Sequence, residues 1–167
     1  NGLGTITTDE LHVYEEGINA DAAAIYLSWG DPKSVERVMT TVKALDRVIL
    51  PSPRGDGKLF SSDWFGGKTI YRETPWNWQK PYSFVIVHPS LILPLYNGDP
   101  TARSQVIGLA DGYLAHGKQA ADGVWTYPNE INFDTGAERG GDLYDASGGA
   151  TPQQTFWGAY RFTGDKK

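Results

Sequence analysis

Two segments of the chain carry apolar residues at helical spacing on a polar background. One runs from Gly30 to Pro51 and the other from Pro100 to His116, and in both the apolar residues recur every three or four positions. This spacing predicts helices with one buried face. We expect both to be outer helices that pack on the rest of the protein along that face.

Three other segments are apolar on most sides and end just before a glycine. They cover approximately residues 21–29, 82–97 and 151–163. This pattern predicts inner helices that pack against several neighbours. The second contains two prolines, so a helix there must kink or begin late, and a strand over residues 83–87 is the alternative interpretation. We assign the tryptophans of the first and third segments, Trp29 and Trp157, to the core.

The same turn follows each of these apolar segments. Residues 29–32, 97–100 and 163–166 read WGDP, NGDP and TGDK, and their glycines are 68 and 66 residues apart. Glycine tolerates the left-handed conformation that ends a helix, aspartate caps the next helix, and proline suits its first position. Self-similarity at a regular spacing predicts a repeat of helical hairpins.

The repeat predicts an all-α fold. We place hairpin 1 at about 21–50, hairpin 2 at about 82–117 and the start of hairpin 3 at about 151–167, all within one domain. The connections 51–81 and 118–150 are far longer than ordinary loops, which favours a functional role. Because the tight turns share one end of the hairpins, the long loops are expected to gather at the other end.

Composition and charge exclude several classes of function. The net charge is −5 without a basic cluster, which disfavours nucleic acid or an anionic membrane as a partner. There is no cysteine for a disulfide, a thiolate nucleophile or a zinc site, and no apolar stretch is long enough to span a bilayer. Phosphate-loop, G-x-S-x-G and H-E-x-x-H motifs are also missing.

The hairpin repeat, the G-D-P turns, the long loops and the closing FWGAYRFTGDKK resemble the six-hairpin glycosidase-like (α/α) toroids. This superfamily includes glycoside hydrolases and polysaccharide lyases. The resemblance implies an (α/α) toroid, of which the chain holds about two and a half hairpins. It also implies a carbohydrate-active enzyme, secreted or periplasmic, that binds a poly- or oligosaccharide at the loop-bearing end.

Aromatic residues in the long loops are candidate sugar platforms, because pyranose rings stack on aromatic faces. Packing of the loops onto the helices is the alternative role for any one of them. Four tryptophans lie in these loops: Trp64, Trp76, Trp78 and Trp125.

Hydrolysis by a carboxylate pair is the favoured reaction. It needs one protonated and one ionised carboxyl group, about 5–5.5 or 6.5–9.5 Å apart depending on the stereochemistry. Glu130, within the sequence NEIN, is the first candidate for a catalytic carboxylate, and Glu15 is the second.

β-Elimination on a uronate-containing glycan is the alternative reaction. It needs groups that neutralise the uronate carboxylate and a base that removes a proton. A non-catalytic α-solenoid module that binds protein is the third possibility. The candidate carboxylate ligands are Arg72, Arg139, Asn129 and Asn132, and the candidate bases are Tyr14, Tyr71, His12 and Tyr144.

No organic cofactor is expected, and the catalytic groups above need no metal. Calcium takes oxygen ligands, and four carboxylates of the last loop could hold it, although their spacing is not that of an EF-hand. They are Asp134, Glu138, Asp142 and Asp145.

We also expect the sequence to be a piece of a longer protein. Two and a half hairpins cannot close a ring, so the remaining segment, in the same chain or another, is an expected partner. Residues 1–167 alone are expected to aggregate or fold loosely and to be inactive.

Overall fold

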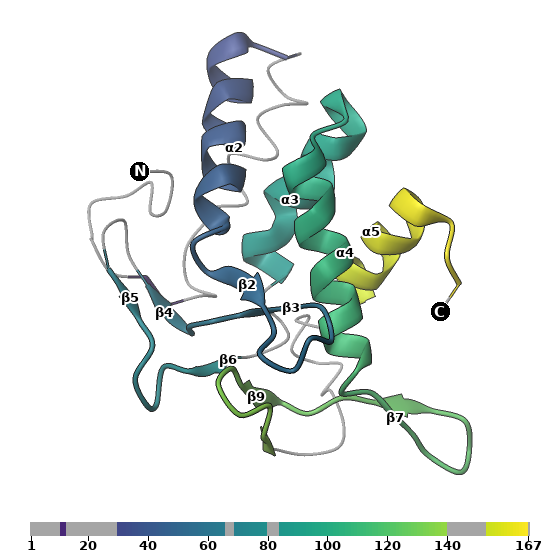
Figure 1. The fold of residues 1–167 in the computed structure, drawn as a ribbon. Helices are drawn as coiled ribbons and strands as arrows, with labels where there is room; N and C mark the ends of the chain where they lie inside the picture. The colour runs from purple at the N-terminus through teal and green to yellow at the C-terminus, as the bar shows by residue number, and fades with distance from the viewer. Residues whose placement is uncertain (1–10, 13–29, 66–68, 80–83, 140–152, 167) are drawn as a thin grey trace.

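A computed structural model describes residues 11–12, 30–65, 69–79, 84–139 and 153–166. The described part contains four helices and ten short strands (Figure 1). The helices are α2 (Pro32–Leu45), α3 (Phe84–Asn97), α4 (Pro100–Leu114) and α5 (Gln153–Thr163).

The strands form four small antiparallel sheets, ordered β1-β4-β5, β10-β9-β6, β2-β3 and β7-β8. They are β1 (Leu11–His12), β2 (Ile49–Pro51), β3 (Lys58–Phe60), β4 (Trp64–Phe65), β5 (Ile70–Tyr71), β6 (Trp78–Gln79), β7 (Lys118–Gln119), β8 (Trp125–Thr126), β9 (Glu130–Asn132) and β10 (Glu138–Arg139).

The prediction of an all-α fold was wrong, because the protein is mixed α/β. The strands lie mostly in the two long segments that the sequence predicted as loops. These segments are rich in aromatic residues, which favour strands. Each strand is only two or three residues long, too short to produce the alternation by which strands are recognised in a sequence.

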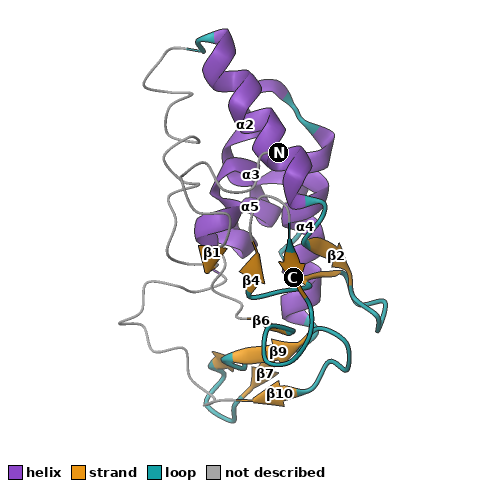
Figure 2. Cartoon of the chain, turned by 90° about the vertical axis from the view of Figure 1, so that its left-hand side faces the viewer, coloured by secondary structure: helices purple, strands orange, loops and turns teal. Residues whose placement is uncertain are grey.

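The repeated turns have the conformation that their sequence predicted. Gly30, Gly98 and Gly164 all adopt positive φ angles, of 75°, 76° and 74°. Asp31 caps α2 and Asp99 caps α4, each through its carboxylate and with a proline in the first helical turn. The cap of α2 and the α3–α4 turn lie at one end of the molecule, and the strands gather at the other (Figures 1 and 2).

Helix boundaries agree with the sequence at α4 and differ at α2. The helix predicted from Gly30 to Pro51 is α2, and it ends at Leu45. Ile49 is instead buried in β2, opposite Phe60 of β3. The apolar residues 48–50 fit the helical spacing, but a short apolar run is equally consistent with a buried strand. The spacing therefore cannot tell the end of a helix from the start of a strand here. Residues 84–87, for which a strand was the alternative, are helical and belong to α3. No helix in the described ranges is long and apolar enough to cross a membrane.

The outer role of α4 and the inner role of α5 were assigned wrongly. α4, predicted as an outer helix, is central and contacts α2, α3, α5 and β3. α5, predicted as an inner helix, buries only Thr155 and Gly158. Its Trp157 is 60% exposed, so the assignment of this side chain to the core was also wrong, while Trp29 lies outside the described residues. Small residues explain the position of α4, because its alanines and glycines let neighbours approach on several sides.

Candidate functional site

Two of the predicted sugar platforms form a pair at the strand-bearing end. The ring centroids of Trp64 and Trp76 are 5.3 Å apart, with the planes tilted by 36°, and both side chains are half-buried. The backbone N–H of Asp63 donates to the carbonyl of Trp76 at 2.7 Å, and the N–H of Trp76 donates to the carbonyl of Glu73 at 2.7 Å. These bonds hold Trp76 beside the start of β4, which contains Trp64, while both side chains stay partly exposed.

A second cluster lies on the sheet β6-β9-β10. One of its members, Trp78, follows Trp76 by two residues in the chain. The guanidinium carbon of Arg139 is 4.0 Å from the ring centroid of Trp78, a cation–π contact. The same guanidinium donates through Nε to Oε2 of Glu130, and the two residues are direct partners across β9 and β10. We call Trp78, Arg139 and Glu130 the Glu130 cluster. It brings together three residues that the sequence singled out separately.

The geometry of the Glu130 cluster limits its chemistry. The Glu130 side chain is 23% exposed and the Arg139 side chain is 47% exposed, so a ligand can reach both residues. The guanidinium of Arg139 fixes the orientation of the Glu130 carboxylate through this contact. A hydrolase would need a second carboxyl group besides Glu130.

Asn132 and Arg72, two of the candidate carboxylate ligands, make hydrogen bonds within the protein that hold the fold. Oδ1 of Asn132 accepts hydrogen bonds from the backbone N–H groups of Asp134 and Thr135 and from the Thr135 hydroxyl. Asn132 therefore holds the β9–β10 turn. The guanidinium of Arg72 donates to the carbonyl of Arg47 at 3.0 Å, which ties the end of β5 to the segment after α2.

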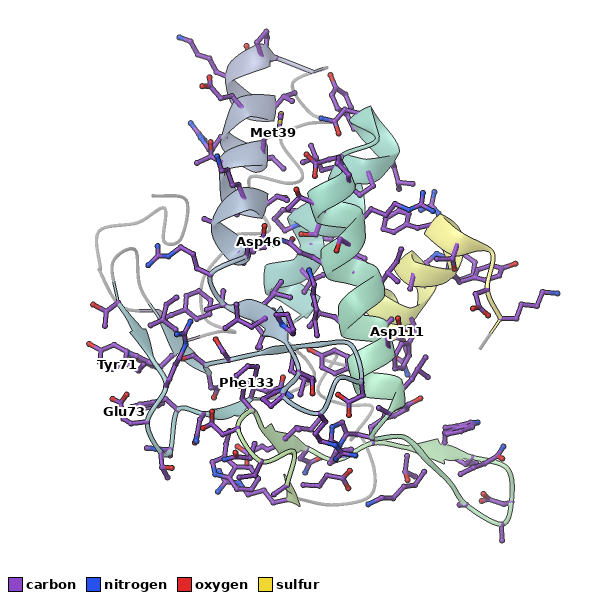
Figure 3. All side chains as sticks on the ribbon, viewed as in Figure 1. Met39, Asp46, Tyr71, Glu73, Asp111 and Phe133 are labelled. Carbon is purple, nitrogen blue, oxygen red and sulfur yellow. The ribbon has the colours of Figure 1, made fainter. Side chains whose placement is uncertain are left out.

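The remaining candidates are dispersed. Tyr71 is half-buried on β5, opposite Trp64, at the edge shown in Figure 3. Asn129 is exposed. Trp125 is 53% exposed on the β7–β8 hairpin, on the opposite side of the molecule from β4 and β5 (Figure 1), so the four tryptophans do not share one face. The other candidates lie outside the residues whose side chains the structure describes: His12, Tyr14, Glu15, Asp142, Tyr144 and Asp145.

The buried His116 and the exposed Lys118 both contact Glu138 of β10. His116 follows α4, is 1% exposed, and its Nδ1 lies 2.7 Å from Oε1 of Glu138. Lys118 donates from Nζ to the other carboxylate oxygen at 2.5 Å. Burial alone would raise the pKa of Glu138, but the hydrogen bonds and charges of Lys118 and His116 lower it below 4.5. The sequence singled out Glu138 only as a calcium ligand, because Glu138 is 22 and 20 residues away from His116 and Lys118 along the chain.

The calcium ligands expected in the last loop do not meet in the described part of the chain. Glu138 is engaged by His116 and Lys118, and Asp134 accepts a hydrogen bond from Asn77 at 2.7 Å. Among the described residues, no three histidine or acidic side chains are arranged to hold a metal ion.

From the contacts of Glu138 with His116 and Lys118 we expect a specific dependence of stability on pH. Glu138→Gln should lower the free energy of unfolding by about 1–2 kcal/mol at pH 7, because a charge-assisted contact with Lys118 and His116 is lost. A carboxylate with a lowered folded-state pKa stabilises the protein above its unfolded pKa, and this contribution disappears as the pH falls through the folded-state pKa. Urea unfolding at pH 7 and at several values below 4.5 should therefore show the difference shrinking with acid.

Glu36→Gln, at an exposed position of α2, is the matched control and should change stability by less than about 0.5 kcal/mol. A Glu138→Gln deficit that stays constant down to pH 2 would contradict this account.

Comparison with known proteins gives no information on function. No family model matches the chain, and neither a curated protein nor a solved structure matches it. Function is therefore inferred from the aromatic pair and the Glu130 cluster.

Proposed function

We propose that the protein is a carbohydrate-active enzyme whose strand-bearing end contacts a poly- or oligosaccharide. The observation that carries this proposal is the Trp64–Trp76 pair beside the Glu130 cluster. Protein sites for sugars combine aromatic faces, on which the apolar side of a ring stacks, with charged groups that bind the hydroxyls. Here Trp64 lies on β4 and Trp76 in the segment before β6, while the partly exposed Glu130 and Arg139 lie on β9 and β10 of the sheet that contains β6.

Hydrolysis of a glycosidic bond is the reaction that we favour. Glu130 is the carboxylate that acts as nucleophile or base, and Arg139 orients it. The second carboxyl group must supply a proton to the leaving oxygen. Glu15 remains the candidate for that role from the sequence.

Elimination is the second candidate, and the exposure of Arg139 favours it. A half-exposed guanidinium stacked on an indole ring can neutralise a uronate carboxylate, which elimination requires. Tyr71 and Tyr14 are then the candidate bases.

A panel of neutral and uronate-containing glycans tests the proposal. New reducing ends without absorbance of a 4,5-unsaturated uronate indicate hydrolysis, and that absorbance indicates elimination. Binding without either product indicates a non-catalytic binding module. A protein that neither binds nor cleaves any member of the panel is not carbohydrate-active.

The aromatic pair supplies the most direct prediction. Trp76→Ala should weaken glycan binding at least about 10-fold, because a stacked aromatic contact contributes on the order of 1.5 kcal/mol or more. Trp76→Phe should retain part of the affinity. Binding is measured by titration with intrinsic tryptophan fluorescence or by calorimetry.

Trp157→Ala is the matched control, since this tryptophan is 60% exposed on α5 and belongs neither to the aromatic pair nor to the Glu130 cluster. It should leave glycan affinity unchanged. Equal losses in Trp76→Ala and Trp157→Ala would place the glycan elsewhere.

A further inference from the structure

A cleft of about 560 Å³ lies between α4 and α5. Its lining residues recur on both helices at positions i, i+3, i+4 and i+7, beginning at Ile107 on α4 and at Gln153 on α5. Each helix therefore turns one stripe toward the cleft. The apolar part of the lining comprises Ile107, Ala110, Leu114, Phe156, Trp157, Ala159 and Tyr160.

The aromatic wall of the cleft is exposed. Trp157 is 60% and Tyr160 is 38% accessible to solvent, and their ring centroids are 5.6 Å apart. Neighbouring exposed aromatic side chains beside an apolar groove are typical of a surface that another element covers. Two helical stripes that meet at an angle form a groove suited to an amphipathic helix.

The turn at the end of α5 leads into this cleft. It repeats the 97–99 turn, at which α3 ends and α4 begins. In both turns the glycine has a φ near 75° and donates its N–H to the carbonyl four residues earlier, at 3.0 Å after α3 and 2.7 Å after α5. In both, the aspartate N–H donates to a side-chain oxygen two residues earlier, at 3.0 Å.

The last residue of this second turn and the residue after it line the cleft. Asp165 and Lys166 are part of its lining, and Arg103, in the first turns of α4, donates to the carbonyl of Phe162. The end of α5 is therefore held beside the start of α4. At the corresponding position of the earlier turn, Asp99 caps α4, which then packs along α3.

We infer that the α4–α5 cleft is the docking site of an amphipathic helix of the same polypeptide, which Asp165 caps. This helix lies along α5 as α4 lies along α3, and its apolar face covers Trp157 and Tyr160. Asp111 lies on the α5 side of α4 (Figure 3) and lines the cleft, so the incoming helix should place a basic residue opposite it. The inference is independent of the proposed function.

The absence of cysteine from the sequence permits a clean accessibility test. Trp157→Cys is made in the natural full-length polypeptide and in a version that ends at Lys167, and the rate of reaction with a maleimide is measured in both. The thiol should react at least 10-fold more slowly in the full-length protein. Val124→Cys, at a 50% exposed position of the β7–β8 hairpin, is the control and should react equally in both.

A second variant tests the cap. Asp165→Ala in the full-length Trp157→Cys protein should restore at least part of the fast reaction, because an N-cap aspartate stabilises the helix that follows it. Equal rates for Trp157→Cys in the two lengths would overturn the inference, as would protection that depends on protein concentration, which indicates a second copy. A natural polypeptide without a helix-forming segment after Asp165 would overturn it as well.

Discussion

Gly112→Ala is expected to destabilise the protein by about 2–4 kcal/mol, although alanine is the better helix former by about 1 kcal/mol. A Cβ atom at this position of α4 would lie 2.2 Å from the carbonyl oxygen of Lys58 and 3.1 Å from its carbonyl carbon. These are backbone atoms of β3, which pairs with β2. The strand cannot retreat without loss of that pairing, so the clash is relieved only by moving α4 from its neighbours.

Gly108→Ala is the matched control, one helical turn earlier on the same face. There the Cβ atom would meet Cγ and Cδ of Lys58 at 2.7 and 2.8 Å, and the outer part of a lysine side chain can rotate away. The variant should therefore stay within about 1 kcal/mol of the wild type, because the gain in helix propensity offsets the rearrangement. Urea unfolding of the two variants measures the difference. Similar free energies of unfolding for Gly108→Ala and Gly112→Ala would contradict the close contact between α4 and β3.

This contact shows how far a sequence can predict tertiary packing. Glycines at 108 and 112 share one face of a helix, which indicates that something approaches closely there. The approaching segment is Gly57 and Lys58, and a Cβ on Gly57 would itself lie 2.5 Å from the backbone nitrogen of Gly112. Nothing in the sequence pairs these distant glycines. This close approach was therefore not predicted, and the spacing alone does not identify its partner.

The helix caps were predictable because all their atoms lie within four residues. Asp99 caps α4 through the N–H of Ala102, and the glycine before it takes the left-handed conformation. The strands were not predictable in the same way. Trp64 and Phe65 form β4 because β1 and β5 flank them, and that pairing depends on residues elsewhere in the chain.

The candidate site shows the same division between local and distant information. Residue type identified Trp78, Glu130 and Arg139 individually as groups that bind sugars or act on them. Their association depends on the register of β6 with β9 and of β9 with β10, which a single sequence does not reveal. Trp157 was misassigned because apolar character favours burial, whereas its exposure depends on which helices pack beside α5.

A buried glutamine joins three helices and should be the most sensitive polar residue of the fold. Gln105 of α4 is fully buried and donates from Nε2 to the carbonyl of Val42 at 2.7 Å and to Oδ1 of Asp46 at 2.8 Å. Its Oε1 accepts from the hydroxyl of Ser90, on α3, at 2.6 Å. Val42 lies in the last turn of α2, where carbonyls lack partners within the helix. Gln105 thus satisfies the end of α2 while fixing α3 against α4.

Gln105→Leu should therefore lower the free energy of unfolding by about 3 kcal/mol or more. Leucine is close in size, so the loss arises mainly from the Val42 carbonyl and the Ser90 hydroxyl, which remain buried without a partner at about 1–3 kcal/mol each. Gln154→Leu, at an exposed position of α5, makes the same chemical change outside the core and should alter stability by less than about 0.5 kcal/mol. Both are measured by urea unfolding monitored by circular dichroism.

A double-mutant cycle separates this network from simple loss of packing. Ser90→Ala alone should cost about 1–2 kcal/mol, since it leaves Oε1 of Gln105 without its donor. In the Gln105→Leu background the same change should cost little or become favourable, because the unpaired hydroxyl is then removed. Strictly additive effects would show that Ser90 and Gln105 do not interact. If Gln105→Leu and Gln154→Leu proved equally stable, the hydrogen bonds of Gln105 would not hold the three helices together.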